Sequence, residues 1–414
     1  MRYLETMRLL LSLIAAATCA TAAELPPWEP GMLDIHQIST GQGNSAFFIF
    51  PDGTTMLLDA GDRGLPSLVG ARPNDSRTPG EWITRYIKRM LPAGSPQEID
   101  FFVLTHFHDD HWGHLGPETK TAASGAYKLS GVTEVGDSLP FHLVLDRGWP
   151  DYQYPYPTAQ QGPLQRPLYL NYRAFLKWQA EHHGTKVERF RAGRKDQIVL
   201  RRDRTGFPDF EVRNIAVNGE IWTGVGDATK SHFPPVESLP REDLPTENMC
   251  CIGFRLRYGK FDYFSGGDIP GTPPAGFPAW HDVETPVAKV VGPVEVLLLD
   301  HHGNMDSQNA FFLSTLRPRV EIISVWSRDH PGQAVLDRLL SQRVYPGPRD
   351  IFATQMSTAN REVIGPRLMD QLKSTEGHVV VRVGLGGANF HVYILDDLTE
   401  SYAVTAVHGP YDCK

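Results

Sequence analysis

The chain has 414 residues, of which 41% are hydrophobic and 21% charged, and its formal net charge is −8. This is globular composition, with enough apolar material for one large domain or two ordinary ones. The acidic balance argues against nonspecific binding of long nucleic acids, which usually depends on a basic surface.

The N-terminus has the pattern of a secretory signal peptide. Arg2 and Arg8 precede the apolar run 9–17, and small residues follow as far as Ala23. This run is too short for a comfortable membrane span, and no later segment is long and apolar enough for one. We therefore expect residues 1–23 to be removed and a single domain, 24–414, to be periplasmic or secreted. A retained membrane anchor is the alternative.

Short strands dominate the first part of the mature chain. They are expected at 33–38, 45–50, 55–59, 101–104 and 141–145. The turn Pro51-Asp52-Gly53 predicts a hairpin, and Thr78 is a suitable N-cap for a helix that continues to Met90. The last two strands are continuous apolar runs, which indicates strands covered on both faces, as in the interior of a layered α/β sandwich.

The second part of the chain shows a similar order of predicted elements. A helix is expected at 168–181, strands within 187–218, a hairpin at 251–265 and another buried strand at 294–299, with long loops at 147–165 and 223–247. In both halves an apolar strand leads directly into histidines. Two similar half-units that share one site therefore explain the pattern better than two independent domains.

The first of these histidine motifs has the spacing of a metal site. It is His106-x-His108-x-Asp110-His111, directly after the strand 101–104. In an extended segment His106 and His108 share a face and can chelate one cation, and after a turn Asp110 and His111 can face a second. Imidazole and carboxylate ligands suit zinc, with iron or manganese as alternatives.

Two further motifs supply partners for this one. Gly266-Gly267-Asp268 ends a predicted strand, and we interpret Asp268 as the bridge between two metals. In His301-His302-Gly303 we expect His302 to complete the shell of the second metal and His301 to face substrate. The pair His182-His183 ends a predicted helix before Gly184 and is expected at the surface.

Together these motifs resemble the metallo-β-lactamase superfamily, and within it the ComEC-like branch, named for a DNA-uptake channel with an extracellular hydrolase domain. The stretches that carry the resemblance are Gly41-Gln42-Gly43-Asn44, Leu57–Gly61, Thr105–Leu115, Glu247-Asn248, Gly267-Asp268, His301-His302-Gly303, Ser324 and His330-Pro331. The resemblance covers roughly residues 31 to 395. It implies a four-layer αββα sandwich of two mixed β-sheets, with the metals at one sheet edge.

The resemblance also implies the ligand sets. His106 and His108 would hold the first metal, Asp110, His111 and His302 the second, and Asp268 would bridge them. Asp59 would orient the metal loop from behind by hydrogen bonds.

One departure is a missing third histidine for the first metal. His142 lies in an apolar strand and is expected in the core, and His232 lies on a polar loop. His114 is expected on a helix that begins near Trp112, behind the ligands or at the surface. The first site could therefore be weakly held, or the centre could work with one metal.

The predicted activity is hydrolysis by a hydroxide formed from metal-activated water, with two divalent metal ions as cofactors. Asp110 would orient the hydroxide, and His301 or His330 would protonate the leaving group. The resemblance favours a phosphoester or phosphodiester, carried by a small molecule or a cell surface. The alternatives are a β-lactamase or lactonase acting on cyclic amides or esters, and a noncatalytic metal-binding protein on the same fold.

The cysteines leave two possibilities open. Cys413 could pair with Cys250 or Cys251 in an oxidising compartment, or all three could be free or buried thiols. The sequence does not indicate an oligomeric state.

Overall fold

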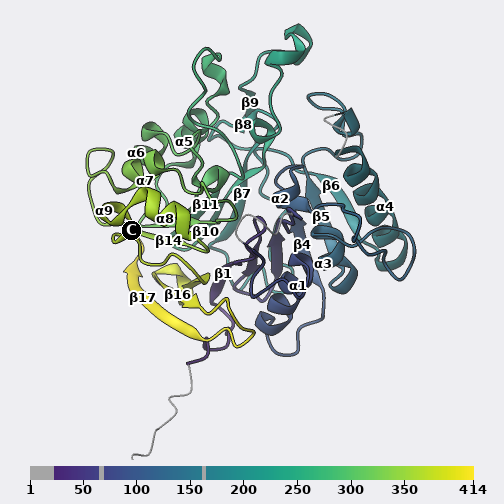
Figure 1. Cartoon of the computed structure of the whole chain (residues 1–414), viewed down its shortest axis with the longest axis horizontal. Helices are drawn as coiled ribbons and strands as arrows, with labels where there is room; N and C mark the ends of the chain where they lie inside the picture. Colours follow the sequence, from purple (N-terminus) through teal and green to yellow (C-terminus); the bar gives the residue numbers. More distant parts are fainter. Residues whose placement is uncertain (1–22, 65–69, 161–164) are drawn as a thin grey trace, which may run out of the picture.

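The computed structural model describes residues 23–64, 70–160 and 165–414 (Figure 1). Apart from residue 23, the predicted signal peptide lies outside these described residues. No helix in the described ranges combines the length and apolarity needed to cross a membrane.

Within these ranges the chain forms two mixed β-sheets. The first has nine strands in the spatial order β17 (Val404–Asp412), β16 (Asn389–Leu395), β15 (His378–Val383), β1 (Leu33–Gln37), β2 (Ala46–Ile49), β3 (Thr55–Leu58), β4 (Ile99–Val103), β5 (Phe141–Asp146) and β6 (Lys186–Arg189). Strands β3 to β6 run parallel, and the other neighbours are antiparallel.

The second sheet has eight strands among the residues described. Their order is β14 (Asp350–Ala353), β13 (Val320–Ile323), β12 (Val296–Leu298), β11 (Phe261–Ser265), β10 (Gly253–Tyr258), β7 (Phe210–Val217), β8 (Glu220–Trp222) and β9 (Thr229–Ser231). Strands β11, β12, β13 and β14 run parallel to one another. The pairs β11–β10, β10–β7, β7–β8 and β8–β9 are antiparallel.

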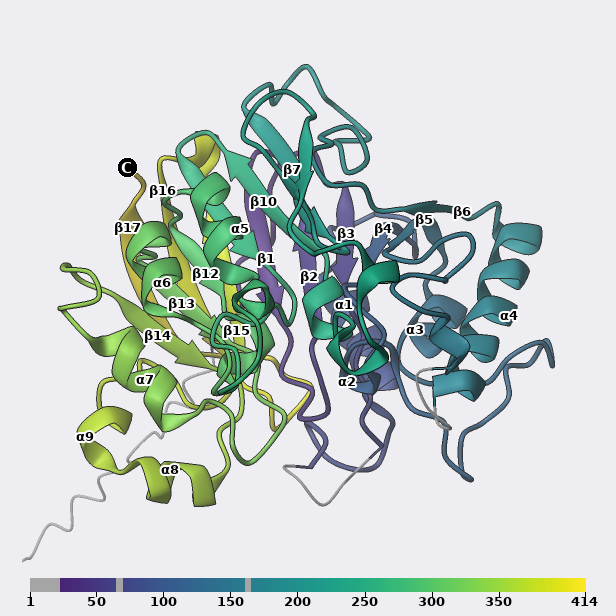
Figure 2. The ribbon, with the colours of Figure 1, turned by 90° about the horizontal axis from the view of Figure 1, so that it is seen from above.

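Helices cover the outer faces of both sheets (Figure 2). On the first sheet they are α1 (Pro79–Met90), α3 (Val132–Ser138) and α4 (Gln165–His183), and on the second α5 (Glu284–Val291), α6 (Ala310–Leu316) and α7 (Gln333–Leu340), with α8 (Thr358–Ile364) and α9 (Pro366–Met369) nearby. A single hydrophobic cluster fills the space between the sheets. The predicted four-layer αββα sandwich is therefore confirmed.

The strand β4 shows why a continuous apolar run suits this architecture. Phe101 and Val103 face the core between the sheets, whereas Phe102 and Leu104 face the cluster under the helices. Because side chains alternate between the two faces of a strand, a segment covered on both faces needs apolar residues on both, as the run 101–104 has. The run 296–299 in and after β12 is divided between two clusters in the same way.

Two local predictions were wrong. The helix near Trp112 is the short α2 (Asp109–Trp112), which ends there because Gly113 has φ +118° and its N–H donates to the Asp109 carbonyl at 2.9 Å, so His114 lies beyond it. His142 is not in the core, since its side chain is 36% exposed and pairs with Glu98 at 2.9 Å. β5 lies near the edge of its sheet, where the outer face is only partly covered.

The last strands complete the sheet that the first strand begins. β15 pairs with β1 along its whole length, with Leu33 opposite Val383. Cys413, just beyond β17, lies in the core between the sheets, whereas Cys250 and Cys251 lie in the cluster under α5 to α7. All three cysteines are free and buried.

One buried carboxyl group interrupts the apolar interior of the second sheet. Glu321 in β13 is fully buried, and Tyr345 donates a hydrogen bond to its Oε1 at 3.0 Å. Its Oε2 has no hydrogen-bond partner among the described residues. Burial raises the pKa of Glu321 to about 8.

Candidate metal centre

The predicted ligands come from loops at the carboxyl ends of three strands. His106 to His111 follow β4, Asp268 follows β11, and His302 lies in the turn after β12. β4 belongs to the first sheet and β11 and β12 to the second. The site therefore lies where the edges of the two sheets meet, which is where an α/β layered fold places its ligands.

The structure brings all six predicted ligands together. Ligand atoms lie within 4.8 Å of one another in two sets. The first set, for the first metal, is His106, His108 and Asp268, and the second set is Asp110, His111, Asp268 and His302. Asp268 belongs to both sets, as the bridging interpretation requires. The cluster is a dimetal-type site that suits two metal ions, and it supports a metal-dependent enzyme.

The second set is the more complete one. His302 Nε2 lies 3.1 Å from Asp110 Oδ2, and His111 Nε2 lies 3.3 Å from Asp268 Oδ2. His111 Nε2 is buried and has no hydrogen-bond partner in the described part of the chain. An imidazole nitrogen left in this way, between two carboxylates, fits a metal ligand.

The first set is smaller. His106 Nε2 lies 3.0 Å from His108 Nδ1 and 3.6 Å from Asp268 Oδ2. No third histidine joins it among the described residues. His142 is in its surface pair with Glu98, and His232 Nε2 contacts the Asp282 carbonyl at 3.0 Å.

Polar groups behind the second set fix the orientation of its imidazoles. Asp59 Oδ2 lies 2.7 Å from His111 Nδ1, and the Ser324 carbonyl lies 2.8 Å from His302 Nδ1. Each acceptor favours the tautomer with the proton on Nδ1, which leaves Nε2 free for a metal. Asp59 also accepts hydrogen bonds from Thr105 N and from Asn44 Nδ2.

The carboxylates of the site are held in the charged form. Burial alone would raise the pKa of Asp268, but the imidazoles of His111 and His302 hold it well below its usual range. The pKa of Asp110 is likewise held down by His111 and His302 against burial. Burial lowers the pKa of His106, which keeps that ring neutral and able to bind a metal.

Glycines allow the metal loop to approach its neighbours. A Cβ on Gly43 would lie 2.3 Å from the Asp110 carbonyl oxygen, and a Cβ on Gly61 would lie 1.9 Å from it. Asn44 N donates to that oxygen at 2.8 Å. The motifs Gly41–Asn44 and Leu57–Gly61 therefore pack closely against the loop 106–111 that carries the predicted ligands.

The turn that carries His302 has an uncommon backbone. His301, His302 and Gly303 all have positive φ, at 47°, 54° and 72°. Left-handed backbone is costly for residues with a Cβ, and such residues concentrate at functional sites. Here it is held by hydrogen bonds from His301 N to the Gly267 carbonyl and from Gly332 N to the Gly303 carbonyl.

A cavity of about 390 Å³ opens onto the cluster, and both predicted proton donors line it. His301 is 20% exposed, with Nδ1 2.7 Å from Asp306 and Nε2 4.0 Å from Asp268. Burial opposes protonation of His301, but Asp306 and Asp268 raise its pKa to about 9. His330 is buried and stacked on His302 at 5.1 Å between ring centroids, and burial together with His302 lowers its pKa to about 3. The N-cap of α7 is Gly332, so His330 does not cap that helix.

A buried ion pair supports the first set and was not predicted. Glu247 accepts a hydrogen bond from Phe107 N, between the two histidines, at 2.8 Å, and another from Arg147 Nε at 2.7 Å. The Arg147 side chain is fully buried. The signal in the sequence was an arginine one residue beyond a buried strand, at the same sheet edge as the metal motif.

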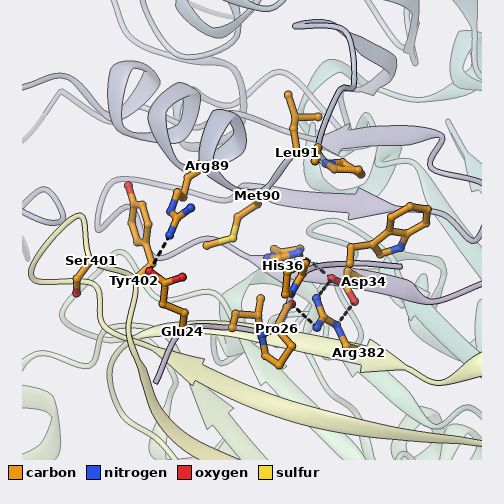
Figure 3. Close-up of a pocket in the computed structure, with 15 residues that line it drawn as sticks. Glu24, Pro26, Asp34, His36, Arg89, Met90, Leu91, Arg382, Ser401 and Tyr402 are labelled. Carbon is orange, nitrogen blue, oxygen red and sulfur yellow. Dashed lines mark hydrogen bonds and ion pairs between the residues drawn. The ribbon is translucent and has the colours of Figure 1, made fainter. Parts of the chain in front are cut away.

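A second cavity, of about 410 Å³, lies beside the N-terminal segment and contains none of the predicted ligands (Figure 3). At its floor Arg382 donates to both oxygens of Asp34, at 2.8 and 2.6 Å, and to the Pro26 carbonyl. His36 Nδ1 lies 2.9 Å from the hydroxyl of Tyr86. These contacts tie the start of the described chain to β1 and β15.

Comparisons with known proteins add little to this geometry. No protein-family model matches the chain, and no curated protein matches it. Among solved structures, the crystal structure of CmlA, a diiron beta-hydroxylase from Streptomyces venezuelae, matches with 14% sequence identity and a TM-score of 0.38. The match covers 85% of this chain and 54% of CmlA, so the chain spans about half the length of that protein.

The arrangement of layers and ligands nevertheless defines the fold. Two mixed sheets lie face to face with helices outside, and a His/Asp dimetal-type cluster lies at their shared edge. This is the arrangement that the resemblance of the sequence to the metallo-β-lactamase superfamily implies.

Proposed function

We propose that this chain is an exported metal-dependent hydrolase of the ComEC-like branch that acts on a phosphoester or phosphodiester. The observation that carries the proposal is the pair of ligand sets that share Asp268 beside an open cavity. The ComEC-like motifs of the sequence favour the phosphorus ester over a cyclic amide or ester.

The roles of the residues follow from their positions. His106, His108, Asp110, His111, Asp268 and His302 would hold two divalent cations, zinc first, with iron or manganese as alternatives. Cations held there would supply the chemistry of lowering the pKa of a water molecule and polarising a phosphoryl oxygen. Asp110 would orient the attacking water, since it lies between His111 and His302 and lines the cavity.

His301 is the better candidate for the proton donor. Its Nδ1 is held by Asp306 at 2.7 Å, and its Nε2, which lies 3.3 Å from Asn248 Nδ2 in this structure, would turn to the leaving group in the cavity. His330 is buried to 3% exposure and packs flat on His302, so its contribution would be to keep that ring in place.

The size of the cavity suits a small molecule or a group that projects from a cell surface. The formal charge of −8 gives no general attraction for a long polyanion.

The decisive experiment combines metal analysis with a substrate panel. The purified mature protein is expected to bind two equivalents of transition metal and to hydrolyse bis(p-nitrophenyl) phosphate. Asp110→Ala should abolish turnover, whereas Asp337→Ala, an exposed residue on α7, should not change it. Less than one equivalent of metal would overturn the proposal.

The rest of the panel separates the alternatives. Activity only on a lactone and nitrocefin would show a hydrolase of cyclic esters and amides. Metal binding with no turnover on any substrate would indicate a noncatalytic metal-binding protein, and turnover that consumes O₂ would show oxidation instead of hydrolysis. Export is tested separately, by N-terminal sequencing of the protein recovered outside the cytoplasm, which should begin near residue 24.

A further inference from the structure

An arginine and a tryptophan meet over the cavity from opposite sheets. Arg63 lies in the loop after β3, and Trp326 follows β13. The Arg63 guanidinium carbon lies 4.8 Å from the centroid of the Trp326 ring, which is the geometry of a cation–π contact. Both side chains line the same cavity as Asp110 and Asp268.

The pair borders the second ligand set directly. The Trp326 ring lies edge-on to His302, with centroids 5.8 Å apart, and to His330, with centroids 5.0 Å apart. On the other side, Arg63 Nη1 donates to Asp109 Oδ1 at 2.6 Å, one residue before the ligand Asp110. These contacts fix the guanidinium in place before any substrate binds.

Hydrogen-bond donors of this pair have no acceptor in the described structure. Arg63 Nε and Trp326 Nε1 are both buried and both lack a partner among the described residues. A buried N–H without an acceptor is costly, so such groups usually meet water or a ligand. Two of them at the wall of one cavity point to an electron-rich group of the substrate, such as phosphoryl oxygens.

The charges around the cavity limit what that group can be. Among the described residues, Arg63 is the only lysine or arginine that lines it. Two acids outside the ligand sets, Asp109 and Asp329, line the same cavity. Apart from His301 and the cations that the ligand sets would hold, one guanidinium lines the cavity, which suits a single negative charge, and the two acids disfavour a second.

We propose that Arg63 and Trp326 form a substrate-binding subsite that selects a monoanionic phosphodiester over a dianionic phosphomonoester. A phosphodiester carries one negative charge at neutral pH, whereas a monoester carries between one and a half and two. This inference rests on the proposed function, because it names the substrate class of the same site.

The test compares substrates of different charge on single variants. Arg63→Gln should raise KM for bis(p-nitrophenyl) phosphate by about 10- to 100-fold, the loss expected for one hydrogen bond to a charged group, and change kcat little. It should affect turnover of the neutral ester p-nitrophenyl acetate less than turnover of the diester. Arg63→Lys should restore part of the loss, and Arg367→Gln, an exposed arginine on α9, is the matched control.

A second variant tests the charge limit. Asp329→Asn should raise kcat/KM for p-nitrophenyl phosphate relative to the diester. The proposal is overturned if Arg63→Gln leaves KM for the diester unchanged, if it slows the neutral ester to the same extent, or if the wild-type protein prefers the monoester. Metal content measured on each variant should equal that of the wild-type protein.

A binding measurement separates this inference from the proposed function. Dimethyl phosphate is a monoanionic diester, and calorimetry can follow its binding to the metal-loaded protein without turnover. If the protein hydrolyses nothing but binds dimethyl phosphate, and Arg63→Gln loses that binding, the proposed function fails and the subsite stands. Equal binding by the two proteins, or no binding by either, overturns the subsite.

Discussion

Asp59→Asn tests whether the second ligand set is oriented from behind. Asp59 accepts hydrogen bonds from Thr105 N at 2.8 Å, Asn44 Nδ2 at 2.9 Å and His111 Nδ1 at 2.7 Å. Its φ is +57°, a conformation that asparagine tolerates better than most residues, so the backbone should be retained. The NH₂ group of the new amide would face either the Thr105 N–H or the His111 Nδ1–H. Because both are donors, one of these two hydrogen bonds would be lost.

The size of the effect follows from that single lost acceptor. A buried hydrogen bond to a charged group contributes about 1.5–3 kcal/mol, which corresponds to about 10- to 100-fold in an equilibrium constant. We therefore expect the metal affinity of the set that contains His111 to fall by that factor, which is also the usual cost of losing a group behind a metal ligand.

The assay is a metal titration in competition with a chromophoric chelator. The matched control is Asp62→Asn, in the same loop, because Asp62 accepts hydrogen bonds from Gly64 N and Ser130 Oγ and contacts no predicted ligand. Wild-type affinity in a folded Asp59→Asn protein would refute the reasoning.

Three further predictions concern the fold and the site. Gly61→Ala should disrupt metal binding, because its Cβ would lie 1.9 Å from the Asp110 carbonyl oxygen, whereas Gly116→Ala makes only ordinary contacts; titration of both variants checks this. Glu321→Gln should stabilise the protein at pH 8 by up to about 5 kcal/mol but have no effect below pH 4, as measured by urea unfolding. The sign follows because the folded pKa of about 8 lies above the ordinary value of 4.5, so the stability of the native protein falls as pH rises between these values. Removing metal with a chelator should lower Tm, and adding metal back should restore it, because a ligand that binds only the folded state stabilises that state.

Each of these predictions can fail clearly. Undiminished metal binding by Gly61→Ala would show that the loop can move away from Asp110. A Glu321→Gln protein whose gain in stability is the same at both pH values would show that packing, not ionisation, limits the native protein. A Tm that does not change when chelator is added would show that metal binding does not stabilise the folded protein.

The sequence alone predicted the parts of the site whose residues are neighbours in the chain. His106 to His111 are neighbours in the chain directly after a buried strand, so their meeting needed only the geometry of an extended segment. Asp268 and His302 were predicted from two motifs that each follow a predicted strand, Gly266-Gly267-Asp268 and His301-His302-Gly303, and their roles as ligands were implied by the resemblance. The four layers were implied by the family resemblance, and apolar runs such as 101–104 indicated only that some strands are covered on both faces.

The features that the sequence did not predict depend on contacts between residues that are distant in the chain. The pairs Arg147–Glu247 and Arg63–Trp326 join loops that only the tertiary fold brings together. His142 was misplaced because an apolar run alone does not show how much of its outer face a helix covers. The helix that was expected to begin near Trp112 ends there instead, because the close approach of Gly113 to Ser130 cannot be seen in local sequence.

Because β1 pairs with β15, the first sheet can be completed only when the last part of the chain is present. A ribosome makes β1 early and its neighbour β15 near the end, so the nascent first sheet has an open edge for most of translation. Open edges attract other strands, and pairings between distant parts of a chain form slowly. We therefore expect a chain that ends before β15 to leave the edge of β1 unpaired and to aggregate instead of forming a smaller working protein.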